Sequence, residues 1–98
     1  MGQHRQAFEA FAEQIIGLET VERVVLFGSV ARGDHGARSD VDILIEVSSL
    51  DQQDNIESTA FSTASAYGVS ITPVIVEQGQ ETSFLQTVEN EGVEYVRG

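Results

Sequence analysis

Three short runs of β-branched and aliphatic residues constrain the fold of this 98-residue chain more than any other feature. They lie at 21–27 (VERVVLF), 41–47 (VDILIEV) and 69–76 (VSITPVIV). Runs of this length, bounded by glycine or polar residues, are typical of strands. Pro73 has no backbone N–H, so the third run is expected at a sheet edge or with a bulge.

Segments with helical periodicity surround these runs. Residues 4–17, 51–67 and 81–89 carry apolar side chains at intervals of three and four, with polar residues between them. Asp51 is placed to cap the second of these helices. The alternation predicts an α/β (α+β) fold in which helices pack on a small mixed β-sheet. We expect residues 1–98 to form a single domain.

Composition excludes several kinds of protein. No apolar run approaches the roughly 18 residues that a membrane span needs. The first residues, MGQHRQAFEAFAEQ, lack the layout of a secretory signal, and the chain has no cysteine. We therefore expect a cytoplasmic protein without a membrane partner.

The charge balance is strongly acidic. Sixteen acidic residues stand against five basic ones, all arginine, for a net charge of −11. Such a chain repels itself at low ionic strength, whereas at about 1 M salt the Debye length falls to roughly 3 Å. The balance favours a halophilic protein; the alternative is an ordinary acidic surface that aids solubility or meets a basic partner. Broad nucleic-acid binding does not fit it.

Two aspartates open the second strand. Side chains alternate along a strand, so Asp40 and Asp42 point to one face while Val41 and Ile43 point to the core. Adjacent carboxylates repel unless a cation lies between them, and magnesium accepts one or two carboxylates together with substrate phosphates. The alternative is a pair of solvated surface acids, since a lone Asp-x-Asp is a weak motif.

The turn before this pair has the chemistry of an anion site. Gly28 lets the chain turn tightly after the first strand, and Ser29 offers a hydroxyl and backbone N–H groups at a helix start. Arg32 lies one turn on and can reach a phosphate. With Arg23 and Arg38, it gives this segment three of the five basic residues. The alternative is a plain strand-to-helix turn with surface arginines.

Residues 26–47, LFGSVARGDHGARSDVDILIEV, resemble the signature of the DNA polymerase beta-type nucleotidyltransferases in their minimal form (MNT proteins). The resemblance implies the nucleotidyltransferase fold. It also implies that Gly28 and Ser29 hold a nucleoside triphosphate, with ATP expected, and that Asp40 and Asp42 are the catalytic residues that coordinate two magnesium ions. Arg32 is expected to bind the nucleotide too. The implied reaction transfers a nucleoside monophosphate to a hydroxyl.

One departure from the family concerns a third carboxylate, which active members carry in the next core strand. Here Thr72 or a neighbour stands where it is expected. Glu46 lies four residues beyond the second aspartate, roughly 13 Å at strand rise, which is too far. Glu77 lies beyond the strand, and Asp34 or His35 could reach the site only if their loop folds back.

Two functions therefore stay open. MNT proteins often pair with a helical HEPN toxin and silence it by adding AMP to a tyrosine, so the resemblance implies an enzyme that acts as an antitoxin. The alternative is a weak or inactive nucleotide-binding domain that serves as an interaction partner of a HEPN protein. Both functions imply a partner, and homo- and hetero-oligomers are both compatible with the sequence.

The charge balance makes a direct prediction about stability. If the acidic surface is an adaptation to salt, the melting temperature rises steeply between low and molar potassium chloride, because screening removes self-repulsion. Calorimetric scans over that range measure it. A flat response would favour the ordinary acidic surface.

Overall fold

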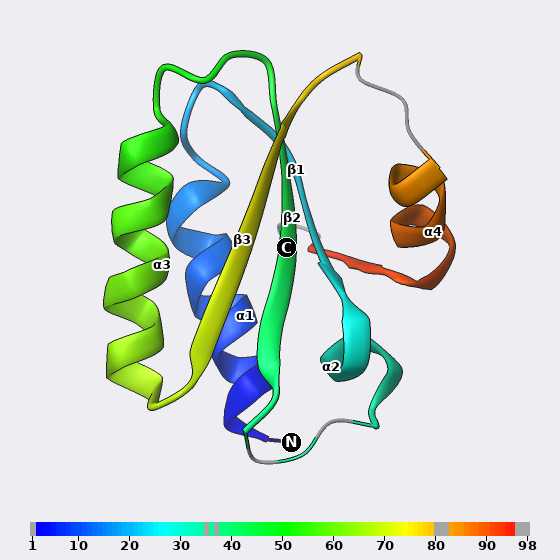
Figure 1. Cartoon of the computed structure of the whole chain (residues 1–98). Helices are drawn as coiled ribbons and strands as arrows, with labels where there is room; N and C mark the ends of the chain where they lie inside the picture. Colours follow the sequence, from blue (N-terminus) through cyan, green and yellow to red (C-terminus); the bar gives the residue numbers. More distant parts are fainter. Residues whose placement is uncertain (1, 35, 37, 80–82, 96–98) are drawn as a thin grey trace.

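The protein is a four-stranded sheet with helices on both faces, shown as a computed structural model in Figure 1. The structure describes residues 2–34, 36, 38–79 and 83–95. In chain order the elements are α1 (Gln3–Ile15), β1 (Val21–Phe27), α2 (Gly28–Arg32), β2 (Asp40–Val47), α3 (Gln53–Tyr67), β3 (Ser70–Glu77), α4 (Ser83–Glu91) and β4 (Val93–Glu94).

The sheet is mixed, with strand order β3-β2-β1-β4. β1 pairs antiparallel with β2 and β4, whereas β2 and β3 are parallel. Parallel neighbours need a crossover, and α3 supplies it. The α/β class and the mixed sheet are confirmed, and so is the edge position of the strand that contains Pro73.

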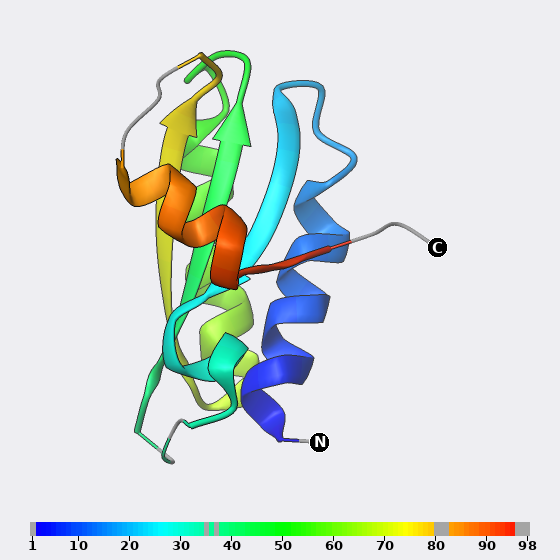
Figure 2. The ribbon, with the colours of Figure 1, turned by 90° about the vertical axis from the view of Figure 1, so that its right-hand side faces the viewer.

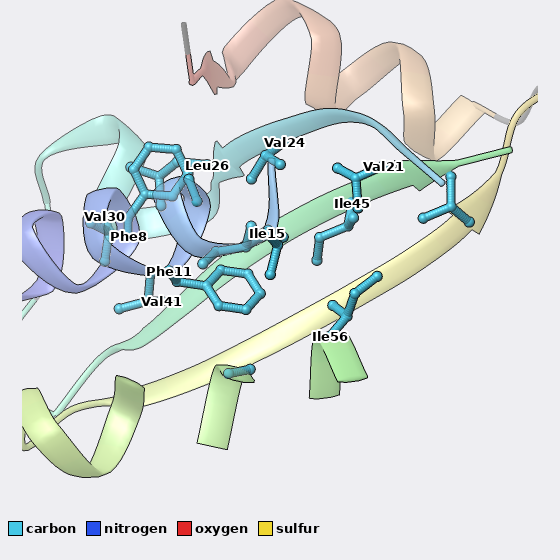
Figure 3. Packing of buried hydrophobic residues seen from close by; sticks show 14 residues of the cluster. Phe8, Phe11, Ile15, Val21, Val24, Leu26, Val30, Val41, Ile45 and Ile56 are labelled. Atoms are coloured by element: carbon cyan, nitrogen blue, oxygen red, sulfur yellow. The ribbon is translucent and has the colours of Figure 1, made fainter. Parts of the chain in front are cut away.

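The helices form two unequal layers around the sheet. α1 and α3 lie against one face (Figure 1), while α4 crosses the other and α2 lies beside the start of β2 (Figure 2). The larger core fills the space between α1, α3 and the sheet (Figure 3). A smaller cluster under α4 consists of Val25, Leu44, Leu85 and Val88.

Two local expectations differ from the structure. The expected cap at Asp51 is wrong: α3 begins one residue later, and its N-cap is Gln52, whose side chain makes no capping hydrogen bond. The tail after α4 forms β4, which the sequence pattern did not predict because two residues are too few for a strand signature. Val93 pairs there with Leu26 of β1.

Gly92 lets β4 lie close to β1. A Cβ atom at this position would collide with the side chain of Val25 and lie 2.5 Å from the carbonyl oxygen of Val88. Both neighbours are buried, so they have little room to move. Only glycine therefore fits between α4 and the sheet without displacement.

Among the described residues, no helix combines the length and the apolar character required to cross a membrane.

The burial of side chains in the core predicts that two phenylalanines contribute very differently to the free energy of unfolding. Phe11 is fully buried, whereas Phe61 on α3 is 76% exposed. Phe11→Ala is expected to lower the free energy of unfolding by about 3–5 kcal/mol through lost burial and a residual cavity. The matched control Phe61→Ala is expected to change it by less than about 0.5 kcal/mol. Chemical denaturation measures both; equal losses would contradict this core.

Candidate nucleotide and metal site

The turn from β1 into α2 brings the backbone against a carboxylate. Phe27 pairs with Asp42 across the antiparallel ladder, so the next residue, Gly28, lies beside the Asp42 side chain. Gly28 has φ +77°, and a Cβ atom there would lie 2.5 Å from Oδ2 of Asp42. Both the left-handed backbone and the close approach require glycine. The expected tight turn at Gly28 is confirmed.

Asp40 and Asp42 share the face of β2 on which α4 packs. Two residues further along that face, Leu44 lies in the cluster under α4. Asp40 is exposed and Asp42 is half-buried, so the pair lies beyond the cover of the helix. The structure therefore brings the two carboxylates together on one open face, as the alternation along the strand predicts.

The environment of Asp42 disfavours its charge. Burial raises the pKa of this carboxyl, and the neighbouring Asp40 carboxylate raises it further, while Arg32 acts in the opposite direction. Partial desolvation and a like charge both penalise the ionised form. A cation placed between the two carboxylates would remove this penalty. Two hard oxygen donors with room for phosphate oxygens are a set that suits magnesium.

Ser29 and Arg32 lie on α2, next to this pair. Ser29 is half-buried in the first turn, where its carbonyl accepts a hydrogen bond of 3.1 Å from the backbone N–H of Asp34. The Arg32 side chain is 48% exposed; its Nε lies 3.3 Å from Oδ2 of Asp34 and its Nη1 3.8 Å from Oε2 of Glu91. Glu91 belongs to α4, so Arg32 links the two helices at the edge of the site.

The strand beside the aspartates offers hydroxyls in place of an acid. In the parallel ladder Asp40 pairs with Ser70 and Asp42 with Thr72. Thr72 thus stands directly opposite Asp42, the position from which a side chain on β3 would complete the site. Within the part of the chain that the structure describes, no group of three or more acidic or histidine side chains is arranged to hold a metal.

The other acids considered from the sequence are engaged or distant. Glu46 lies 3.7 Å from the guanidinium of Arg23, further along the sheet. This agrees with the prediction that Glu46 is too far away to be the third carboxylate of the site. Glu77 pairs with Val47 at the far end of β3. Asp34 contacts Arg32, and His35 lies outside the described residues.

The three arginines do not gather at one place. Arg23 lies between Glu46 and Glu94 on the sheet, with both contacts at 3.7 Å, and only Arg32 is close enough to influence Asp42. Arg38 is exposed in the loop before β2. Glu91 and Ser70 were missed from the sequence, because only the tertiary arrangement brings them to the site.

The turn at Gly28 thus lies against Asp42, one of two aspartates that share a face of the sheet in an α/β fold. The sequence model of the Nucleotidyltransferase domain family matches residues 5–95. The chain therefore belongs to the nucleotidyltransferase domain family. The resemblance found in the sequence and the nucleotidyltransferase fold it implied are confirmed.

Two proteins similar to this chain are described as an adenylyltransferase and as a minimal nucleotidyltransferase. A Methanocaldococcus jannaschii protein, provisionally named a protein adenylyltransferase, is 42% identical over 79 residues, which cover 78% of this chain and 80% of the relative. A structure provisionally described as a minimal nucleotidyltransferase has TM-score 0.70 and 25% identity, with 95% of each chain covered.

A third similar structure comes from a complex. It contains a tri-AMPylated HEPN toxin of Shewanella oneidensis and an MNT antitoxin. The match has TM-score 0.63 and 19% identity, and it covers 93% of this chain and 70% of the other. At this identity the match shows a shared fold.

The raised pKa of Asp42 predicts a pH-dependent stability. In the folded protein the pKa of the Asp42 carboxyl lies above its ordinary value of 3.8. The bound proton therefore stabilises the folded state fully below pH 3.8, and this stabilisation is lost as pH rises through the raised pKa. Asp42→Asn removes the ionisation. The variant is therefore expected to melt above the wild type at pH 7 without metal.

The difference in melting temperature between Asp42→Asn and the wild type should narrow as the pH falls toward 3.8. Asp51→Asn, in the turn before α3, is the control and should show no such gain. A constant difference at every pH would contradict the electrostatic origin.

Proposed function

We propose that this protein transfers AMP from magnesium-bound ATP to a hydroxyl of a protein partner, a tyrosine of a HEPN toxin, and thereby acts as an antitoxin. The observation that carries the proposal is the contact between the Gly28 turn and the Asp42 carboxylate. It puts a backbone suited to phosphates beside a carboxylate pair suited to magnesium.

The residues have distinct roles in this proposal. Asp40 and Asp42 hold magnesium, which when bound neutralises charge on the triphosphate and on the leaving pyrophosphate. The backbone at Gly28 and Ser29 and the hydroxyl of Ser29 orient the phosphates. Arg32 contributes a planar cation beside them, which requires it to exchange the carboxylates of Asp34 and Glu91 for phosphate oxygens.

The open character of the face supports a macromolecular acceptor. Asp40 and Thr72 are exposed, and nothing in the described part of the chain pairs with the outer side of β3. A hydroxyl on another protein can therefore approach the pair directly. The 42% identical relative named as a protein adenylyltransferase and the complex with an AMPylated HEPN toxin support the same type of acceptor.

Thr72 opposite Asp42 favours a second candidate function. A two-carboxylate site can bind the nucleotide but lacks a group to accept the proton of the attacking hydroxyl, a contribution of about 10²–10⁴ in rate. In this second function the protein binds nucleotide and a HEPN protein while transfer is slow or absent.

Thr72→Asp tests both functions. With labelled ATP, magnesium and the HEPN partner, the variant is expected to transfer AMP to the partner's tyrosine at least tenfold faster than the wild type, because it restores the third carboxylate. Thr72→Asn is the matched control, because asparagine has nearly the same shape as aspartate but no charge. This variant should transfer AMP at the wild-type rate.

Fast transfer by the wild type that Thr72→Asp leaves unchanged would show that the third ligand lies elsewhere. Absence of transfer in wild type and variant, with the partner bound, would favour the non-catalytic function.

A further inference from the structure

A surface groove lies on the face of the sheet opposite the aspartates. It has a volume of about 590 Å³ and runs between α3 and the edge strand β3. Ile71 and Pro73 line it; they pair with the buried Val41 and Ile43, so they point to the α1 and α3 side. Besides Phe61, the apolar side chains of the lining are Ala60, Ala64, Val69, Ile71 and Pro73.

Phe61 forms one wall of this groove. Phe61 is 76% exposed, more than the other large exposed hydrophobic residues of the described chain, Leu50 and Tyr67. It also borders a second hollow, of about 520 Å³, together with Asp54 and Ser58. Isolated apolar residues on a surface are common, but an exposed aromatic ring beside an apolar groove is typical of an interaction site.

The charge around the groove selects the kind of partner. Glu57 lines both hollows and Asp54 lines the second, and neither α3 nor β3 contains a lysine, an arginine or a histidine. A second copy of the chain would bring the same acids and a net charge of −11 to the contact. A partner with apolar side chains flanked by basic ones complements this surface.

The edge strand also limits how a partner can bind. Pro73, in the middle of β3, has no N–H to donate, so an added strand would find a broken ladder. An amphipathic helix in a groove needs only side-chain contacts.

We infer that the α3–β3 groove docks a basic amphipathic helix of a partner protein, with Phe61 as the central contact. This docking surface goes beyond the proposed transfer reaction, and it leaves the face of Asp40 and Asp42 open to the acceptor.

A synthetic amphipathic peptide of about 15 residues, with leucines on one face and arginines on the other, serves as the probe. We expect fluorescence anisotropy to show that Phe61→Ser weakens its binding at least tenfold. The control is Leu50→Ser, which removes another apolar side chain, 46% exposed, in the loop before α3; it should change the affinity less than twofold.

The salt concentration separates the contributions of charge and of apolar contact to peptide binding. Glu57→Gln should weaken binding at 0.1 M potassium chloride and lose most of that effect at about 1 M, whereas the effect of Phe61→Ser persists. A peptide with glutamates in place of the arginines should not bind. Backbone amide shifts induced by the arginine peptide should centre on Ala64 and Ile71, in the groove.

Three results of the peptide experiments would overturn the inference. They are unchanged binding by Phe61→Ser, equal binding of the glutamate peptide, and amide shifts that centre outside the groove. Sedimentation that reveals a dimer disrupted by Phe61→Ser would assign the groove to a second copy instead. None of these results bears on magnesium or ATP binding at the aspartates, so this inference and the proposed function fail separately.

Discussion

The antiparallel pairing of β1 with β2 is the constraint on which the candidate site depends. The register that sets Phe27 against Asp42 also sets Gly28 against the Asp42 carboxylate, where a Cβ atom would be 2.5 Å from Oδ2. Shifting one strand by a single residue would turn the aspartates into the core and the isoleucines toward solvent. The buried cluster under α1 and α3 therefore holds the register, and through it the site.

Much of this arrangement follows from the sequence. The three main strands, the turn at Gly28 and the shared face of Asp40 and Asp42 depend on local periodicity and on glycine, and all agree with the structure. β4 and the contact between Arg32 and Glu91 could not be predicted, because they join segments far apart in the chain. The three arginines near the Gly28 turn in the sequence suggested an anion site, but Arg23 lies with Glu46 instead.

The two faces of β3 belong to different candidate sites, one to the aspartate site and one to the groove. On the side of the sheet that faces α4, Thr72 stands opposite Asp42, where a third carboxylate is expected. On the side that faces α3, Pro73 lines an apolar groove that Glu57 borders. Because β3 is an edge strand, both features meet the solvent at the same border of the sheet. A partner that docks in the groove is therefore close to the site, which is consistent with a small domain that acts on the protein it binds.

Thermal unfolding with magnesium and ATP tests the central claim most directly, that the carboxylate pair beside Gly28 holds a metal-bound nucleotide. In molar potassium chloride, ATP at 100 times its Kd with magnesium should stabilise the wild type by about 2.7 kcal/mol. Removal of magnesium, or the double variant Asp40→Asn with Asp42→Asn, should abolish the metal-dependent part. Equal stabilisation of the wild type and the double variant would contradict the claim.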